Sequence, residues 1–136
     1  AGTGQLGLEA LSRGAEHCTF VDQRREAAAL VRENIRLCRF EDRARVAQEE
    51  SLSFLSLCRE KFDIVFLDPP YASGLLEKSL ESLTRFDILR EHGIIVCESG
   101  TDWSVPTLTP PYEAGREYRY GQIKLTVCRR AGSVSR

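Results

Sequence analysis

The stretch that decides the fold is FDIVFLDPPY, at residues 62–71. Its first six residues are almost continuously apolar, which is typical of a strand in a parallel sheet that helices cover on both faces. A carboxylate, Asp68, ends the strand, and Pro69 and Pro70 follow it. Because proline fixes its own backbone angle and has no N–H group, the sequence predicts a rigid turn with free carbonyl oxygens at the carboxyl end of this strand.

Segments with helical and strand patterns alternate on both sides of residues 62–71. We expect helices at 7–13, 24–38 and 75–86, and one more that begins at a capping residue, Ser51. We expect strands at 17–22, 44–48, 62–68, 93–98, 117–120 and 123–128. The alternation predicts a doubly wound, mostly parallel α/β sheet, and the last two strands predict a C-terminal antiparallel hairpin.

A glycine-rich loop opens the chain. Residues 2–7, GTGQLG, fit the pattern GxGxxG, and Asp22 ends the next expected strand twenty positions after Gly2. Glycines allow backbone amides to approach a ligand closely, and a carboxylate at the position of Asp22 can accept hydrogen bonds from ribose hydroxyls. The loop therefore indicates a nucleoside-containing cofactor, but it does not distinguish a nicotinamide dinucleotide from S-adenosylmethionine.

No strand precedes this loop in the sequence. In a doubly wound sheet such a loop follows the first strand, which lies at the centre of the sheet. A sheet without its central strand has two unpaired inner edges. We therefore expect that a strand upstream of Ala1 belongs to the fold, and that residues 1–136 alone are unstable or inactive as a monomer.

The motif at 68–71 suits methylation of an amino group on a nucleic-acid base. Such an amine has two protons and a lone pair conjugated with the ring. The carboxylate of Asp68 and the carbonyl of Pro69 can accept the two protons and direct the lone pair. Pro70 fixes the turn, and Tyr71 can stack on the base, which contributes about 1–3 kcal/mol. These four residues are the candidate catalytic residues.

Several segments together resemble the RsmD-type family of bacterial 16S rRNA guanine-N2 methyltransferases. They are AGTGQLGLEALSRGA at 1–15, FVD at 20–22, FLDPPY at 66–71 and GIIVCE at 93–98. The resemblance implies a class I methyltransferase fold, S-adenosylmethionine as the methyl donor, and a guanine of 16S ribosomal RNA, free or in the small ribosomal subunit, as the acceptor. Family members also have a β-hairpin extension and a strand before the glycine loop, which residues 1–136 lack.

The same resemblance implies the cofactor contacts. Gly2, Thr3 and Gly4 would line the methionine end, and Asp22 would bind the ribose. Glu50 and Ser51 stand where the family usually has Asp-Ala and would meet the adenine.

Other functions remain open at this point. The motif at 68–71 also occurs in methyltransferases that act on adenine N6, cytosine N4 or glutamine. An NAD-dependent oxidoreductase would explain the glycine loop but not the prolines. An inactive binding fragment is a third possibility. Glu98 ends another strand at the ligand-binding edge and is a further candidate for a place near the substrate.

Composition sets the wider limits. We expect one domain at 1–131 and a tail at 132–136, with no membrane span, because no apolar run approaches the roughly 20 residues that a bilayer requires. The net charge is −1, but residues 113–136 carry six basic and two acidic side chains, which indicates a local basic surface. The five cysteines lack metal-ligand spacing, so we expect buried thiols, no metal and a reducing cytoplasm. The oligomeric state is not indicated.

Overall fold

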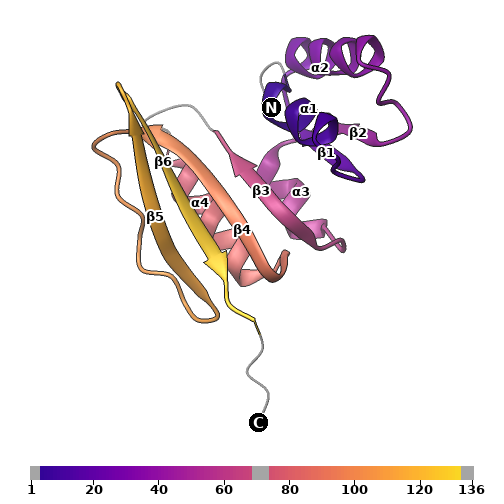
Figure 1. Cartoon of the computed structure of the whole chain (residues 1–136). Helices are drawn as coiled ribbons and strands as arrows, with labels where there is room; N and C mark the ends of the chain where they lie inside the picture. Colours follow the sequence, from indigo (N-terminus) through magenta and orange to yellow (C-terminus); the bar gives the residue numbers. More distant parts are fainter. Residues whose placement is uncertain (1–3, 69–73, 133–136) are drawn as a thin grey trace. The chain divides into compact units, whose positions relative to one another are not determined.

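The computed structural model describes residues 4–68 and 74–132 of the chain (Figure 1). The elements follow in the order α1 (Gln5–Ser12), β1 (Cys18–Val21), α2 (Arg25–Leu37), β2 (Ala44–Ala47), α3 (Ser51–Leu57), β3 (Phe62–Leu67), α4 (Leu75–Arg85), β4 (Leu89–Gly100), β5 (Tyr112–Tyr120) and β6 (Ile123–Arg130). The chain divides into two compact units, Ala1–Phe54 and Leu55–Arg136, and each is described by itself.

The first unit is built on two parallel strands. β1 and β2 pair in register from Cys18 opposite Ala44 to Val21 opposite Ala47. Apolar residues of α2 recur at helical spacing, so that one face of this helix is buried. The buried cluster consists of Leu11 from α1, Phe20 from β1, and Val31 and Ile35 from α2.

Two glycines bring α1 against β1. Gly4 precedes α1 with φ of 80°, a left-handed conformation that other residues rarely adopt. At Gly7, an added Cβ atom would lie 2.4 Å from a ring carbon of Phe20. The third glycine of the GxGxxG pattern therefore allows close helix–strand packing.

The second unit contains a mixed four-stranded sheet in the order β3-β4-β6-β5. β3 and β4 are parallel, whereas β6 is antiparallel to both β4 and β5. Figure 1 shows α4 lying along one face of this sheet. The helix buries its apolar stripe there, Leu76, Leu80 and Leu83, and the sheet buries Ile95, Cys97 and Cys128.

The predicted α/β fold and the C-terminal hairpin are confirmed, but two strands are longer than expected. β4 begins at Leu89 rather than at 93, and β5 begins at Tyr112 rather than at 117. The register of β5 shifts between Ala114 and Glu117. This irregularity breaks the two-residue alternation by which a strand is recognised in a sequence, so the first half of β5 was missed.

The prediction that β3 is covered on both faces is wrong. Ile64 and Phe66 are 48% and 38% exposed. They alternate along the strand with Val65 and Leu67, which share a face with the buried residues of β4. An apolar run predicts a strand, but it does not specify what packs on each face.

The cysteines also differ from the expectation in part. Cys97 and Cys128 are buried, but Cys38 is exposed at the end of α2, and all five thiols are free. Within residues 4–68 and 74–132, no group of three or more His, Cys, Asp or Glu side chains is arranged to hold a metal ion. None of the described helices combines the length and apolar character required to cross a membrane. Of the expected tail at 132–136, residues 133–136 lie outside the described part.

Candidate functional site

Asp22 lies at the carboxyl edge of the first unit. It directly follows β1, and its backbone N–H donates to the carbonyl oxygen of Ala47 at 3.2 Å. Its side chain is only 10% exposed. The sequence pattern therefore placed this carboxylate correctly at the end of a parallel strand, the edge where open α/β sheets bind ligands.

Arg24 covers the carboxylate of Asp22, and the sequence analysis missed this residue. Its backbone N–H donates to Oδ1 at 2.9 Å, and its guanidinium donates to both carboxylate oxygens, at 3.1 Å and 3.0 Å. Burial raises the pKa of Asp22, but hydrogen bonds, among them those from Arg24, outweigh this effect, and the pKa lies well below its usual range. Asp22 is therefore held as a carboxylate, the form that accepts hydrogen bonds from hydroxyls.

Glu50 caps α3. Its Oε1 accepts from the backbone N–H of Leu52 at 2.9 Å, and its Oε2 accepts from the backbone N–H of Ser53 at 2.9 Å. These hydrogen bonds, first of all the one from Leu52, lower the pKa of Glu50. The expectation that Ser51 caps this helix is wrong, because Ser51 is already its first residue and Glu50 satisfies the free N–H groups.

Asp68 lies at the carboxyl end of β3 in the second unit, where the sequence predicted it. Its side chain is exposed, while Glu98, near the end of the neighbouring β4, is half-buried. Burial raises the pKa of Glu98, and the negative charge of Asp68 and a hydrogen bond between the two side chains raise it further. Two carboxyl groups therefore meet at this edge, where only one had been assigned.

The candidate residues are thus distributed over both units. Gly4, Asp22, Glu50 and Ser51 belong to the first unit, and Asp68 belongs to the second. The remaining five candidates lie outside the described residues: Gly2, Thr3, Pro69, Pro70 and Tyr71.

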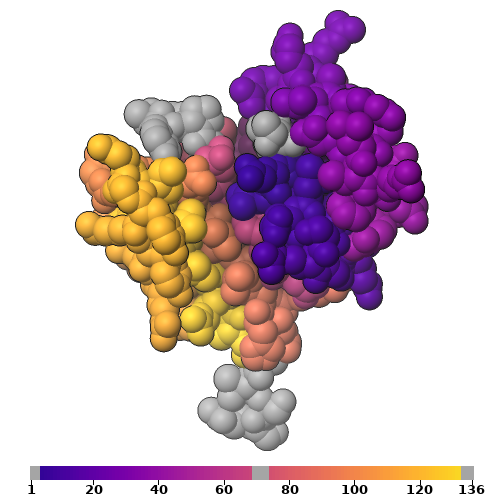
Figure 2. Space-filling view, turned by 45° about the horizontal axis from the view of Figure 1, so that its top comes forward, coloured from indigo at the N-terminus to yellow at the C-terminus, as the bar shows by residue number. Residues whose placement is uncertain are grey.

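The expected basic surface on the C-terminal hairpin is smaller than the count of charges suggests. The hairpin, gold to yellow in Figure 2, lies at the surface. Arg116, Arg119 and Arg129 are exposed on it. Lys124, however, is only 2% exposed and pairs with Glu117 at 3.2 Å. Arg130 is likewise occupied, because it pairs with Asp87 at 2.8 Å.

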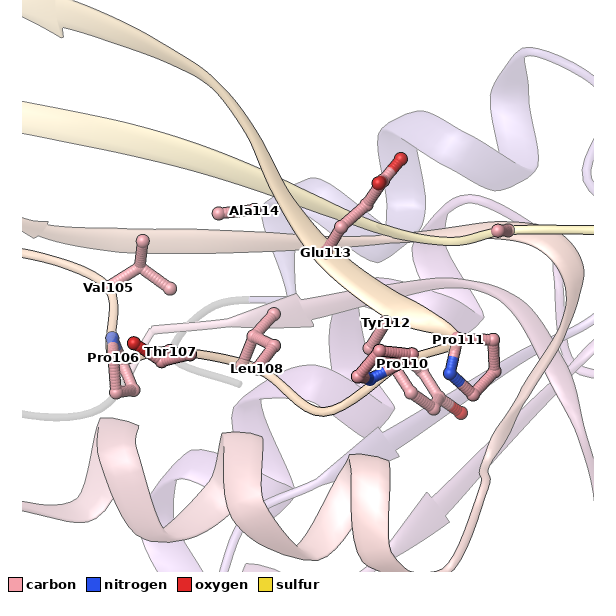
Figure 3. A pocket seen from close by; sticks show the side chains of 10 residues that line it. Val105, Pro106, Thr107, Leu108, Pro110, Pro111, Tyr112, Glu113 and Ala114 are labelled. Carbon is pink, nitrogen blue, oxygen red and sulfur yellow. The ribbon is translucent and has the colours of Figure 1, made fainter.

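One groove of the second unit is lined by residues that do not include Asp68. It has a volume of about 510 Å³, and its mostly apolar lining comes from residues 105–108 and 110–114 and from Ala131 (Figure 3). Tyr112 in this lining pairs with Arg130, and the preceding residue of β6 pairs with Ile94. The lining residues given for the groove include none from β3 or β4, whose carboxyl ends lead to Asp68 and carry Glu98.

Comparison with known proteins identifies the family. Residues 1–129 match the family described as Conserved hypothetical protein 95. YlbH of Bacillus subtilis is 32% identical over 135 residues, which cover 97% of this chain and 73% of YlbH. Ribosomal RNA small subunit methyltransferase D of Escherichia coli is 34% identical over 123 residues, which cover 90% of this chain and 62% of that protein.

Solved structures agree with this assignment. A conserved hypothetical protein from Streptococcus pyogenes superposes with a TM-score of 0.88 at 32% identity, covering 96% of this chain and 81% of that one. The predicted class I methyltransferase fold is confirmed by these and further structural relatives. The chain therefore belongs to the Conserved hypothetical protein 95 family, the RsmD-type methyltransferases that its motifs resemble.

Proposed function

We propose that this protein transfers a methyl group from S-adenosylmethionine to the exocyclic N2 amine of a guanine in 16S ribosomal RNA. The observation that carries the proposal is the carboxylate of Asp68 at the carboxyl end of β3, followed in the sequence by Pro-Pro-Tyr. The family and the name of the 34% identical Escherichia coli relative support the choice of ribosomal RNA as substrate.

The first unit has features that suit the cofactor. Gly4 has a left-handed backbone, and an added Cβ atom would lie 3.2 Å from both Phe20 and Val31, a tight contact that favours glycine at this position. We assign Gly2, Thr3 and Gly4 to the methionine end of the cofactor. Asp22 would accept hydrogen bonds from the ribose hydroxyls, and Glu50 and Ser51 would lie at the adenine. When bound, the cofactor supplies an electrophilic methyl group on a sulfonium.

The catalytic residues would act on the amine. Asp68 and the carbonyl of Pro69 would accept hydrogen bonds from its two N–H groups, which raises the electron density on nitrogen and directs the lone pair. Pro70 keeps the turn rigid, and Tyr71 stacks on the guanine. The nitrogen would take the methyl group from the sulfonium, the electron pair of the broken carbon–sulfur bond would stay on sulfur, and the methylated amine would then release one proton to water.

The RNA partner sets the rest of the proposal. We assign residues 1–131 to the methyltransferase domain, with Arg116, Arg119 and Arg129 on its exposed hairpin available to phosphates. A reaction on ribosomal RNA places the protein in the cytoplasm.

The test is Asp68→Ala in the full-length protein, with Asp63→Ala as the matched control. Asp63 lies on the same strand, but its side chain is 72% exposed and pairs with Arg90. Transfer of labelled methyl groups to 16S RNA and to small subunits is measured together with calorimetric binding of S-adenosylmethionine and of NAD. We expect Asp68→Ala to lower the rate of methyl transfer by far more than tenfold, while S-adenosylmethionine still binds.

Three results would contradict the proposal. Transfer by Asp68→Ala within about tenfold of wild type, a barrier change of only about 1.4 kcal/mol, removes Asp68 from the reaction. Binding of NAD in place of S-adenosylmethionine indicates an oxidoreductase. A methyl group on adenine N6, found by mass spectrometry of digested RNA, changes the acceptor.

A further inference from the structure

Glu98 lies beside Asp68 at the carboxyl ends of two parallel strands. β3 and β4 pair in register, with Leu67 opposite Cys97. Continued by one residue, this register sets Asp68 opposite Glu98 on strands about 4.8 Å apart, and side chains opposite each other point to the same side of a sheet. The sheet itself therefore brings these two carboxyl groups together.

The two groups are placed so that they can share a proton. A hydrogen bond between the two side chains is one cause of the raised pKa of Glu98. An ionised carboxylate only accepts hydrogen bonds, so one member of such a pair must be protonated. Glu98 is the half-buried member, and burial and the charge of Asp68 both raise its pKa. When the pair holds one proton, Glu98 is therefore the group that would carry it and donate it to Asp68.

The surroundings of Glu98 in the sheet offer no cation in place of that proton. Its partner on β6 is Leu125, and the next residue of β4 on the same face, Gly100, pairs with Ile123. Lys124 belongs to the opposite, buried face of β6 and pairs with Glu117. Within residues 4–68 and 74–132, none of the ion pairs includes Asp68 or Glu98.

We propose that Glu98 is a positioning residue for methyl transfer, which holds one carboxylate oxygen of Asp68 through a shared proton and thereby leaves the other oxygen directed toward the amine of the base. This inference rests on the proposed function. Glu98 acts through Asp68, because a carboxylate that is fixed at one oxygen loses the freedom to rotate. The reacting carboxylate then has its orientation set before the base arrives.

Two substitutions in the full-length protein separate this role from a structural one. Glu98→Gln keeps an N–H donor toward Asp68, so we expect kcat within about threefold of wild type, whereas Glu98→Ala lowers kcat by at least about tenfold. Neither changes the KM for S-adenosylmethionine. Glu113→Gln, at an exposed carboxylate on β5, is the matched control. Equal losses in the Gln and Ala variants, or wild-type kcat in Glu98→Ala, would overturn the proposal.

The pH profile gives a second criterion. When the pH rises through the raised pKa of Glu98, the wild-type pair loses its proton, and two negative charges then repel each other. We expect kcat of the wild-type protein to fall through this range, and we expect Glu98→Gln to show no such fall. The same fall in Glu98→Gln would contradict the shared proton.

A readout without methyl transfer keeps the inference distinct from the proposed function. Carbon-13 NMR of the glutamate carboxyl groups follows the titration of Glu98, assigned by its loss in Glu98→Gln. We expect the pKa of Glu98 to fall by at least about half a unit in Asp68→Asn, because a neighbouring negative charge is removed. An unchanged titration overturns the inference. A wild-type protein that shows the coupled titration but transfers no methyl group to RNA overturns the proposed function alone.

Discussion

The guanidinium of Arg24 lies across the carboxylate of Asp22 and donates to both of its oxygens, at 3.1 Å and 3.0 Å. The arginine side chain is 64% exposed, whereas the carboxylate beneath it is 10% exposed. A solvent-exposed side chain therefore covers a largely buried one. Under the proposed function, Arg24 occupies the oxygen atoms that the ribose hydroxyls would use, so cofactor binding would have to displace it.

The first prediction is that Arg24→Ala tightens the binding of S-adenosylmethionine. An ion pair with one exposed partner contributes about 0.2–1 kcal/mol, so releasing it should lower Kd by up to about fivefold. Calorimetric titration measures this change. Arg25→Ala removes the same charge from the exposed neighbouring position and is the control for long-range electrostatics.

Asp22→Ala shows whether the effect passes through this carboxylate. It should weaken binding at least tenfold, because charge-assisted hydrogen bonds contribute about 1.5–3 kcal/mol each. Arg24→Ala should then change nothing further in that background. Weaker binding by Arg24→Ala alone would mean that the arginine supports the cofactor rather than competing with it.

The second prediction concerns Gly7. Alanine in place of glycine within a helix normally stabilises the helix by about 1 kcal/mol. Here the added Cβ atom would lie 2.4 Å from the ring of Phe20, which is only 4% exposed, so the ring or the helix would have to shift. Overpacking costs about 1–3 kcal/mol, so we expect Gly7→Ala to lower the free energy of unfolding. Chemical denaturation measures this, with Gln5→Ala on the exposed face of α1 as the control. A stabilised variant would show that the helix can shift away from β1.

The third prediction concerns Asp87, which accepts from Tyr112 Oη at 2.5 Å, Arg130 Nε at 2.8 Å and Lys61 Nζ at 3.2 Å. These contacts hold the pKa of Asp87 well below its usual range, first of all through Arg130. Asparagine also tolerates the left-handed backbone here, φ 52°. Asp87→Asn should therefore lower the free energy of unfolding by about 1–2 kcal/mol at pH 7, mainly because the negative charge is lost.

The pH dependence of this loss has a definite sign. A depressed pKa contributes stability above the unfolded value, near 3.9, and this contribution disappears as the pH falls. The difference in free energy of unfolding between wild type and Asp87→Asn should therefore disappear below about pH 4. The contribution of Tyr112 to stability has the opposite pH dependence. Burial and Asp87 raise the pKa of Tyr112 to about 12, so this contribution is lost as the pH rises from about 10 to 12. A gap that is constant from pH 3 to 7 would contradict the role of the charge.

Sequence reasoning located the carboxylates because their positions follow from strand ends. Asp22 and Asp68 each come directly after an apolar strand, and the carboxyl ends of parallel strands share one edge of a sheet. The same logic applied to Glu98, but its contact with Asp68 depends on which strands are neighbours. Strand order is a property of the whole fold and is not encoded locally in either segment.

Side-chain partners were less predictable. Arg24 and Arg25 are adjacent in the sequence, and only the backbone turn after β1 brings Arg24 onto Asp22. Serine often caps helices, yet here the side chain of Glu50, and not that of Ser51, accepts hydrogen bonds from the free N–H groups. In both cases the local backbone conformation determines which of two neighbouring residues makes the contact, and composition and periodicity do not specify that conformation.

The buried Lys124 can report how often the C-terminal hairpin opens. The chain has three lysines, and while Lys61 and Lys78 are exposed, the amine of Lys124 is withdrawn from water. Reagents that modify amines therefore reach it only during excursions in which β6 separates from what covers it. The ratio of its labelling rate to that of Lys78, followed by mass spectrometry, therefore measures how often this part of the sheet opens.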